Sequence, residues 1–239
     1  MFKLGVSGAS GKMGKRIISL AKENKDIDVI FGLEDENHPS VGKVVDGVKI
    51  TADSGKIKEC DCLIDFSAPA ATIENLSLVR KFSKCMVIGT TGFDHSQRSK
   101  IKELSSKTGV VFSPNMSVGV NLLFRLVKES AHLLKKYNVF IEEAHHIHKK
   151  DAPSGTAKKI AEIINRQGFN LKIEDIKAVR EDEIVGDHRV VFESDADRIE
   201  LFHSAKTRDI FAKGAILAAR WVLDKPAGLY SMDDVLFGK

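Results

Sequence analysis

Short apolar runs alternate with helical patterns along the first half of the chain. The runs predict strands at Leu4–Ser7, Asp28–Leu33, Cys62–Phe66, Met86–Gly89 and Val110–Ser113. Between them, apolar side chains recur every three or four residues, which predicts helices at Lys12–Glu23, Ala70–Phe82 and Ser96–Lys107. Strands separated by helices of this length indicate βαβ crossovers and a mainly parallel sheet.

The second half of the chain has a different order of predicted helices and strands. Helices are predicted at Asn121–Lys135, Ala157–Arg166 and Arg208–Leu223. Strands are predicted at Val139–His146, Asp175–Arg180, His188–Glu193 and Asp197–His203. Because the last three strands follow one another through short turns, we expect an α+β domain with an antiparallel or mixed sheet. The order of predicted elements changes near Pro114–Gly119, which is therefore the candidate hinge between two domains.

The amino-acid composition argues against membrane proteins, disulfide-rich proteins and nucleic-acid-binding proteins. Hydrophobic residues make up 43% of the 239 residues and charged residues 29%, which is typical of a soluble globular protein. No apolar stretch approaches the ~20 residues of a membrane span, and no signal-peptide pattern opens the chain. Three cysteines suggest no disulfide framework and favour a reducing cytoplasm. A net charge of +4 without a basic tail, and with one Trp and two Tyr, argues against nucleic-acid binding.

A glycine-rich turn, Gly8–Gly14, stands between the first predicted strand and the first predicted helix. Such a turn lets the backbone approach a pyrophosphate, and the free N–H groups at the helix start point toward the phosphates. The spacing is GxxGxxG rather than GxGxxG, so the strand–turn–helix context carries the prediction. The alternative is a tight turn without a ligand.

An acidic residue, Glu34, closes the second predicted strand about twenty residues beyond the glycine turn, where a carboxylate can bind a ribose diol. Asp35 and Glu36 follow it, and no Arg is present there to neutralise a 2′-phosphate. We therefore expect NADH to be preferred, with NADPH possible. Two more loops, Gly89–Gly92 and Ser113–Met116, follow predicted strands and are placed to touch the same cofactor, unless they are plain turns.

The densest chemical signal is the segment 142–156. It holds three His and two Lys within six residues, which can supply acid–base groups near neutral pH and fixed positive charge. His146 and His148 would share one face of a strand, so a metal site is a competing interpretation, as is a solvated basic loop. No further ligands are evident and the cations would repel a metal ion, so we expect no metal.

The same segment ends in a helix start. Pro favours the first helical turn, Ser or Thr can cap it, and Gly leaves room for a ligand at Pro153–Thr156. A helix N-terminus attracts carboxylates, although capping without a ligand is the simpler alternative. With the His and Lys side chains, this start predicts a pocket for a small carboxylate-bearing substrate.

Together these segments resemble the dihydrodipicolinate reductase (4-hydroxy-tetrahydrodipicolinate reductase) family. The motifs that carry the resemblance run in the family's order over essentially the whole chain: Gly8–Gly14, Ile64–Ser67, Gly89–Phe93, Ser113–Asn121, Glu143–His146, Ser154–Thr156, Val185–His188 and Ser204–Ala205.

The resemblance implies a two-domain oxidoreductase. Residues 1–116 with 209–239 would form a Rossmann-type dinucleotide-binding domain, and residues 117–208 an α+β substrate-binding and tetramerisation domain with a mixed sheet. It further implies that hydride from NAD(P)H reduces a cyclic, imine-containing dicarboxylate to tetrahydrodipicolinate, with loss of water, in lysine and diaminopimelate biosynthesis. The protein would be a cytoplasmic homotetramer.

The resemblance also implies roles for single residues. His145 matches the family's proton donor and acceptor, Lys149 a second proton donor, and His146, Gly155 and Thr156 match substrate-binding positions. The positions that match cofactor-binding residues are Gly8, Ala9, Ser10, Gly11, Lys12, Met13, Glu34, Gly89, Thr90, Thr91, Ser113, Pro114, Asn115 and Met116. Asp35 stands where the family often has a basic residue, which counts against NADPH.

Three other functions are weighed against this one. A related Rossmann oxidoreductase acting on another small carboxylate, such as an amino-acid dehydrogenase, would not need the His/Lys segment. A non-catalytic dinucleotide sensor would need neither His145 nor Lys149. A zinc hydrolase would need metal ligands beyond His146 and His148.

Overall fold

The computed structural model describes residues 1–238, which fall into two compact units. The first comprises Met1–Ser117 and the chain from Phe211 onward, and the second comprises Val118–Ile210. The helix α4 (Val118–Leu133) begins at the first boundary, next to the candidate hinge. The predicted domains divide the chain at 116/117 and 208/209, and the binding role of each domain stays a prediction.

The first unit is built on an eight-stranded sheet with the order β12-β7-β6-β5-β1-β2-β4-β3. All neighbours in it are parallel except β3 and β4. Its strands are β1 (Phe2–Ser7), β2 (Ile27–Leu33), β3 (Val44–Val45), β4 (Val48–Thr51), β5 (Cys62–Asp65), β6 (Cys85–Ile88), β7 (Gly109–Phe112) and β12 (Gly228–Tyr230). Because the chain leaves β1 first toward β2 and later toward β5, the strand order reverses there, which is where ligands bind in such sheets.

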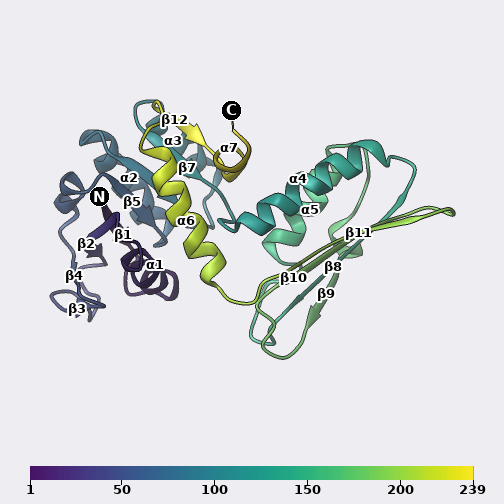
Figure 1. Cartoon of the computed structure of the whole chain (residues 1–239), viewed down its shortest axis with the longest axis horizontal. Helices are drawn as coiled ribbons and strands as arrows, with labels where there is room; N and C mark the ends of the chain where they lie inside the picture. The colour runs from purple at the N-terminus through teal and green to yellow at the C-terminus, as the bar shows by residue number, and fades with distance from the viewer. Residues whose placement is uncertain (239) are drawn as a thin grey trace. The chain divides into compact units, whose positions relative to one another are not determined.

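Helices cover both faces of this sheet, because the strand side chains are apolar on both sides (Figure 1). Helices α1 (Lys12–Lys22), α6 (Asp209–Val222) and α7 (Met232–Phe237) contribute to one core with Leu4, Val6 and Ile64. Helices α2 (Pro69–Lys81) and α3 (His95–Ser105), with the 3-10 helix η1 (Ser54–Glu59), form the other with Leu63 and Met86. None of the helices within residues 1–238 is long and apolar enough to cross a membrane.

The second unit is a four-stranded mixed sheet with the order β11-β10-β8-β9. Strands β8 (Asn138–His145) and β9 (Lys177–Arg180) are parallel, whereas β10 (Asp187–Glu193) and β11 (Arg198–Ser204) continue the sheet antiparallel. Helices α4 and α5 (Gly155–Asn165) pack on one face of it (Figure 1), where Ile141, Val190 and Phe192 form the core with Ile160 and Ile164.

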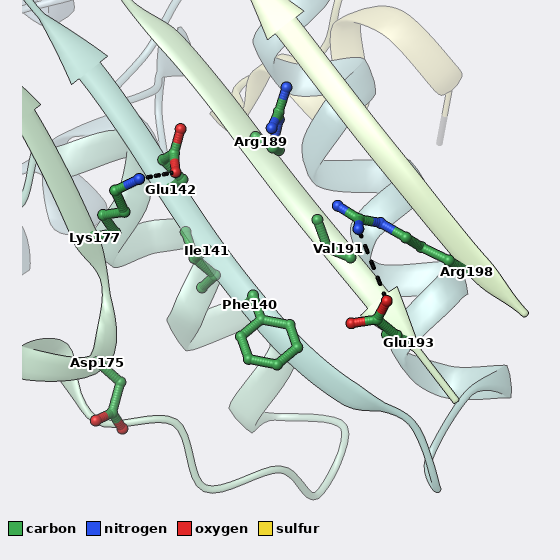
Figure 2. Close-up of a pocket in the computed structure, with 9 residues that line it drawn as sticks. All are labelled: Phe140, Ile141, Glu142, Asp175, Lys177, Arg189, Val191, Glu193 and Arg198. Atoms are coloured by element: carbon green, nitrogen blue, oxygen red, sulfur yellow. Dashed lines mark ion pairs between the residues drawn. The ribbon is translucent and has the colours of Figure 1, made fainter. Parts of the chain in front are cut away.

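The opposite face of this sheet carries a hollow of about 380 Å³, and Figure 2 shows the side chains that line it. Phe140 is 56% exposed there, and Phe202 on the same face is 55% exposed. Ion pairs surround them, such as Lys177 with Glu142 at 2.8 Å between Nζ and Oε2. This face mixes large apolar side chains with paired charges.

The predicted fold class is confirmed, with local corrections. The strand expected at Asp175–Arg180 begins only at Lys177, because residues 173–175 form the 3-10 helix η2 (Ile173–Asp175). Strands β3, β4 and β12, the 3-10 helix η1 and helix α7 were not expected. The strands among them span two to four residues, too few to show a period in the sequence.

Candidate active site

The glycine turn lies at the carboxyl end of β1 and opens onto a pocket of about 550 Å³. Gly8 has a φ of +70°, and a Cβ at this position would stand 2.3 Å from the carbonyl oxygen of Phe66. Gly14 packs its helix against the same turn, since a Cβ there would lie 2.1 Å from the oxygen of Gly8. Both positions therefore require glycine, and the turn holds the start of α1 at the pocket.

Two helices begin at this pocket without a side-chain cap. Gly11 precedes α1 and Ala68 precedes α2; both line the pocket, and neither makes a side-chain capping bond. In contrast, Asp94 and Ser154 cap α3 and α5. In addition, Ser10 Oγ is buried without a hydrogen-bond partner among the described residues. Because uncapped helix starts bind anions through their N–H groups, these residues fit the pyrophosphate of a dinucleotide.

Glu34 connects the glycine turn to the acidic side of the pocket. Its Oε1 accepts a hydrogen bond from the Ser10 N–H at 2.5 Å. Asp35, Glu36 and His38 line the pocket beyond Glu34, and no Lys or Arg is among the described lining residues. This side suits a neutral ribose diol better than a 2′-phosphate.

A second pocket of about 300 Å³ adjoins the first through Phe66, which lines both. Of the predicted cofactor-binding residues, it collects Met13, Gly89, Ser113, Pro114, Asn115 and Met116. Gly89 makes room for the Phe66 ring, because a Cβ on Gly89 would lie 2.1 Å from it. The two pockets thus give a dinucleotide a continuous lining at the carboxyl end of the sheet.

Four predicted cofactor-binding residues line neither pocket. Ala9 is fully buried, Lys12 and Thr91 are exposed away from both, and Thr90 is buried. The Thr90 hydroxyl donates to Asp65 Oδ1 at 2.8 Å. Asp65 is fully buried and also accepts hydrogen bonds from Ser67, Thr72 and Asn75. Thr90 therefore helps to fix the loops after β5 and β6, a part of the site that sequence reasoning left without a role.

In the second unit, His145 is held by a buried carboxylate. Its Nδ1 hydrogen-bonds Oε2 of Glu143, whose side chain is fully buried. The other oxygen, Oε1, accepts from Arg180 Nη2 at 2.8 Å and from the Ser154 N–H at 3.1 Å. His188 packs edge-on against the His145 ring at 5.3 Å between centroids, and its Nε2 is 3.3 Å from Ser154 Oγ.

These contacts set the charge states of the cluster. Burial raises the pKa of the Glu143 carboxyl, but hydrogen bonds from Arg180 and His145 outweigh it, so the pKa lies below its usual range. Burial lowers the pKa of His145 more than Glu143 raises it. Burial, with repulsion from His145, lowers the pKa of His188 to about 3. At neutral pH the cluster therefore holds an ionised Glu143 and two neutral imidazoles.

Lys149 lies near enough to His145 for its charge to lower the pKa of that imidazole. Its Nζ is paired with Asp151 Oδ1 at 2.7 Å. His146 follows β8, and its Nε2 is 3.4 Å from Nη2 of Arg208, a residue that sequence reasoning did not single out. The segment thus gathers several cations near one neutral imidazole.

The predicted carboxylate site lies at the start of α5. Ser154 caps the helix through its Oγ, which accepts from the Ala157 N–H at 3.2 Å. Gly155 follows with open space around it, since nothing lies within 4 Å of a Cβ built there. Thr156 is the second residue of the helix. Because Glu143 binds the Ser154 N–H, this helix start is fixed directly to the His145 cluster.

The competing metal interpretation rests on His146 and His148. The rings of His146 and His148 are 6.2 Å apart between centroids. Within residues 1–238, no group of three or more His, Cys, Asp or Glu side chains is arranged to hold a metal ion.

Comparison with known proteins identifies the family. The family model described as dihydrodipicolinate reductase, N-terminus, matches residues 2–116, and the one described as dihydrodipicolinate reductase, C-terminus, matches residues 119–236. The chain belongs to the dihydrodipicolinate reductase family. The family predicted from the sequence is thereby confirmed, and with it an NAD(P)H-dependent oxidoreductase of the reduction step in lysine and diaminopimelate biosynthesis.

Two relatives show how completely the family match extends. The 4-hydroxy-tetrahydrodipicolinate reductase of Aquifex aeolicus is 42% identical, and the alignment covers 97% of this chain and 97% of that protein. The enzyme of the same name from Citrifermentans bemidjiense is 38% identical over 99% of each.

Solved structures share the fold at lower identity. Dipicolinate-bound dihydrodipicolinate reductase from Paenisporosarcina sp. TG-14 superimposes with a TM-score of 0.83 at 22% identity, covering 97% of each chain. An amine dehydrogenase from Mycobacterium smegmatis reaches 0.64 at 10% identity over 97% of this chain and 95% of that one. The fold of this reductase family is thus shared with other dehydrogenases, so the side chains must decide the reaction.

Proposed function

We propose that this protein reduces 4-hydroxy-tetrahydrodipicolinate to tetrahydrodipicolinate, with loss of water. The observation that carries the proposal is the neutral His145 imidazole, held by buried Glu143 beside Lys149 and the start of α5. When bound, the nicotinamide supplies the hydride. The residues of this chain bind the dicarboxylate, orient it and move the protons.

His145 and Lys149 are the proposed catalytic residues. With Nδ1 bound to Glu143, His145 has only Nε2 left for exchanging a proton with the substrate. The Lys149 ammonium stabilises the negative charge that develops on the ring as hydride arrives, and it can donate the second proton. Both groups come from β8 and the turn that follows it.

The substrate carboxylates are proposed to bind at the start of α5. Gly155 and Thr156 offer the first helical turn to an anion, and Gly155 leaves space for it. His146, whose Nε2 lies near Nη2 of Arg208, is proposed to contact the substrate through its side chain.

The test of this proposal is steady-state turnover of NADH with substrate made in situ from pyruvate and aspartate semialdehyde by a coupling enzyme. His145→Ala and Lys149→Ala should each lower kcat by about 10²-fold or more, since general acid–base catalysis contributes on that order. NADH binding, followed by its fluorescence, should be retained. The matched controls are His132→Ala and Lys136→Ala, two exposed residues outside segment 142–156, which should keep normal turnover. Near-normal turnover in a His145 or Lys149 variant would remove that residue from the mechanism.

The proposed cofactor-binding residues are those that line the two pockets of the first unit: Gly8, Ser10, Gly11, Met13, Glu34, Gly89, Ser113, Pro114, Asn115 and Met116. Ala9, Lys12, Thr90 and Thr91 are proposed only as supports of these loops. NADH is the proposed preferred cofactor, because Glu34, Asp35 and Glu36 would repel a 2′-phosphate.

The cofactor preference is tested by comparing kcat/KM for NADH and NADPH. We expect the native protein to favour NADH, and Asp35→Arg to raise kcat/KM for NADPH at least about tenfold, through a charge-assisted contact with the 2′-phosphate. Glu23→Arg makes the same charge change at an exposed position outside the pocket, so it should leave the ratio unchanged. A clear NADPH preference of the native protein would contradict the proposal.

A homotetrameric assembly and a cytoplasmic location complete the proposed function. The exposed Phe140 and Phe202 on the open face of the four-stranded sheet support the assembly. The location follows from the biosynthetic role of the family.

A further inference from the structure

In the mechanism above, Glu143 serves only as the hydrogen-bond partner of His145. Its side chain is fully buried, and all its described partners are donors: the Arg180 guanidinium, the Ser154 N–H and the His145 ring. A buried carboxylate is costly unless its oxygens are satisfied, and here both oxygens are. Its position therefore points to a specific task.

The register of the sheet brings these groups together. Glu143 and His145 are two residues apart on β8, so both point to the side that carries α4 and α5. Arg180 is the partner of His145 in β9, and His188 is the partner of Glu143 in β10. The carboxylate is thus enclosed by neighbouring strands on both sides.

We propose that Glu143 is a positioning residue that fixes His145 as the tautomer protonated on Nδ1 and keeps Nε2 free to exchange the proton. The inference rests on the proposed catalytic role of His145. An ionised carboxylate can only accept hydrogen bonds, so the ring nitrogen facing it must carry hydrogen. Nε2 then has the lone pair in the neutral ring.

The two oxygens of Glu143 have different roles. Oε1 faces two obligatory donors, Arg180 Nη2 and the Ser154 N–H, whereas Oε2 faces only His145 Nδ1. In Glu143→Gln the amide oxygen must take the Oε1 position to satisfy both donors. The amide NH₂ is then directed at Nδ1, which must accept. The substitution is therefore expected to reverse the tautomer and place the hydrogen on Nε2.

The same carboxylate joins His145 to the proposed substrate site. Through Ser154 it fixes the first turn of α5, where the substrate carboxylate would bind. The Glu143 carboxylate thus fixes both the His145 ring and the first turn of α5. It thereby keeps the distance between the proton-exchanging nitrogen and the proposed carboxylate site constant.

The first test is a long-range ¹⁵N–¹H correlation spectrum of the histidine-labelled protein near neutral pH, with His145 assigned through His145→Gln. In the native protein His145 should show the pattern of the Nδ1–H tautomer, and in Glu143→Gln the pattern of the Nε2–H tautomer. The result in the native protein alone can overturn the proposal, even if the variant does not fold. An Nε2–H pattern in the native protein would do so, as would an unchanged tautomer in folded Glu143→Gln.

The second test is the pH profile of kcat/KM. Of the charged groups that face His145, Glu143 raises its pKa, while Lys149 from the following turn and Arg180 from β9 lower it; neutral His188 packs against it from β10. Without the carboxylate charge of Glu143, the remaining charged groups all lower the pKa of His145. The pH at which His145 titrates in this profile should therefore move down in Glu143→Gln. We also expect kcat to fall by about 10²-fold or more, with KM changed much less.

Glu142→Gln is the matched control. Glu142 is the neighbouring acid on β8, faces the other side of the sheet and pairs with exposed Lys177. It should leave the tautomer and the pH profile unchanged. If Glu143→Gln moves the tautomer while His145→Ala retains full turnover, the positioning stands and the catalytic role of His145 fails. If His145→Ala is inactive but the tautomer and pH profile do not move, the proposal about Glu143 fails alone.

Discussion

At the scale of single residues, access to the proposed catalytic imidazole, His145, depends on a glycine. Gly186 precedes β10, and its oxygen accepts from the Ala205 N–H at 3.0 Å, so its backbone is fixed. A Cβ on Gly186 would stand 2.9 Å from His145 Nε2, the nitrogen proposed to exchange the proton. Glu143 holds the ring from the other nitrogen, so the ring cannot turn away without losing that bond.

Gly186→Ala should therefore lower kcat by about tenfold or more, because the ring must shift or Nε2 becomes covered; misplacement at a reacting centre has effects of this order. The fold should persist, since the φ of Gly186 is not in the left-handed region. Turnover is measured as NADH oxidation, with thermal unfolding as the check on folding. Unchanged kcat in a folded variant would mean that Nε2 is approached from a different side.

At the scale of elements, the sequence predicted the strands and helices that show a periodic pattern and the site residues that are consecutive in the chain. Apolar patterns predicted strands β1, β2, β5, β6 and β7 and helices α1, α2 and α3, but not the outer strands β3, β4 and β12. The His145–Thr156 segment was predicted because its chemistry is consecutive. Arg180 and His188 were missed. They lie 37 and 45 residues along the chain from Glu143 and reach it only through the register of β8 with β9 and β10. The local patterns predict each strand but not which strands become neighbours, so they do not bring these residues together.

The proposed cofactor-binding loops also combine a feature that the sequence predicts with features that it does not. Glycines at the end of a strand were correctly interpreted as a turn that opens onto a pocket. Their neighbours Ala9 and Thr90 were expected to touch the cofactor, but Ala9 packs in the core and Thr90 binds Asp65. A motif marks the loop, whereas the direction of each side chain is decided by packing.

At the scale of the whole molecule, the four-stranded sheet has one covered face and one open face. Helices α4 and α5 bury the first face. Phe140 and Val191 lie on the second face between ion pairs (Figure 2), and the strand register places Phe202 on the same face. An antiparallel sheet can face water, but two phenylalanines that are more than half exposed favour burial against a further surface. The Arg189 guanidinium lies 5.8 Å from the Phe202 ring centroid. Arginine and aromatic side chains are both enriched in protein interfaces.

If the open face is where subunits meet, charges placed at Phe140 and Phe202 must break the assembly, because each would be buried without a partner. Light scattering after gel filtration should give the native protein about four times the 26.3 kDa of one chain. The double variant Phe140→Lys, Phe202→Lys should give a lower mass. Val44→Lys is the control, since Val44 is 66% exposed on β3 in the other unit and should leave the mass unchanged. A native mass of one chain would contradict the tetramer, and an undiminished mass of the double variant would place the contact elsewhere.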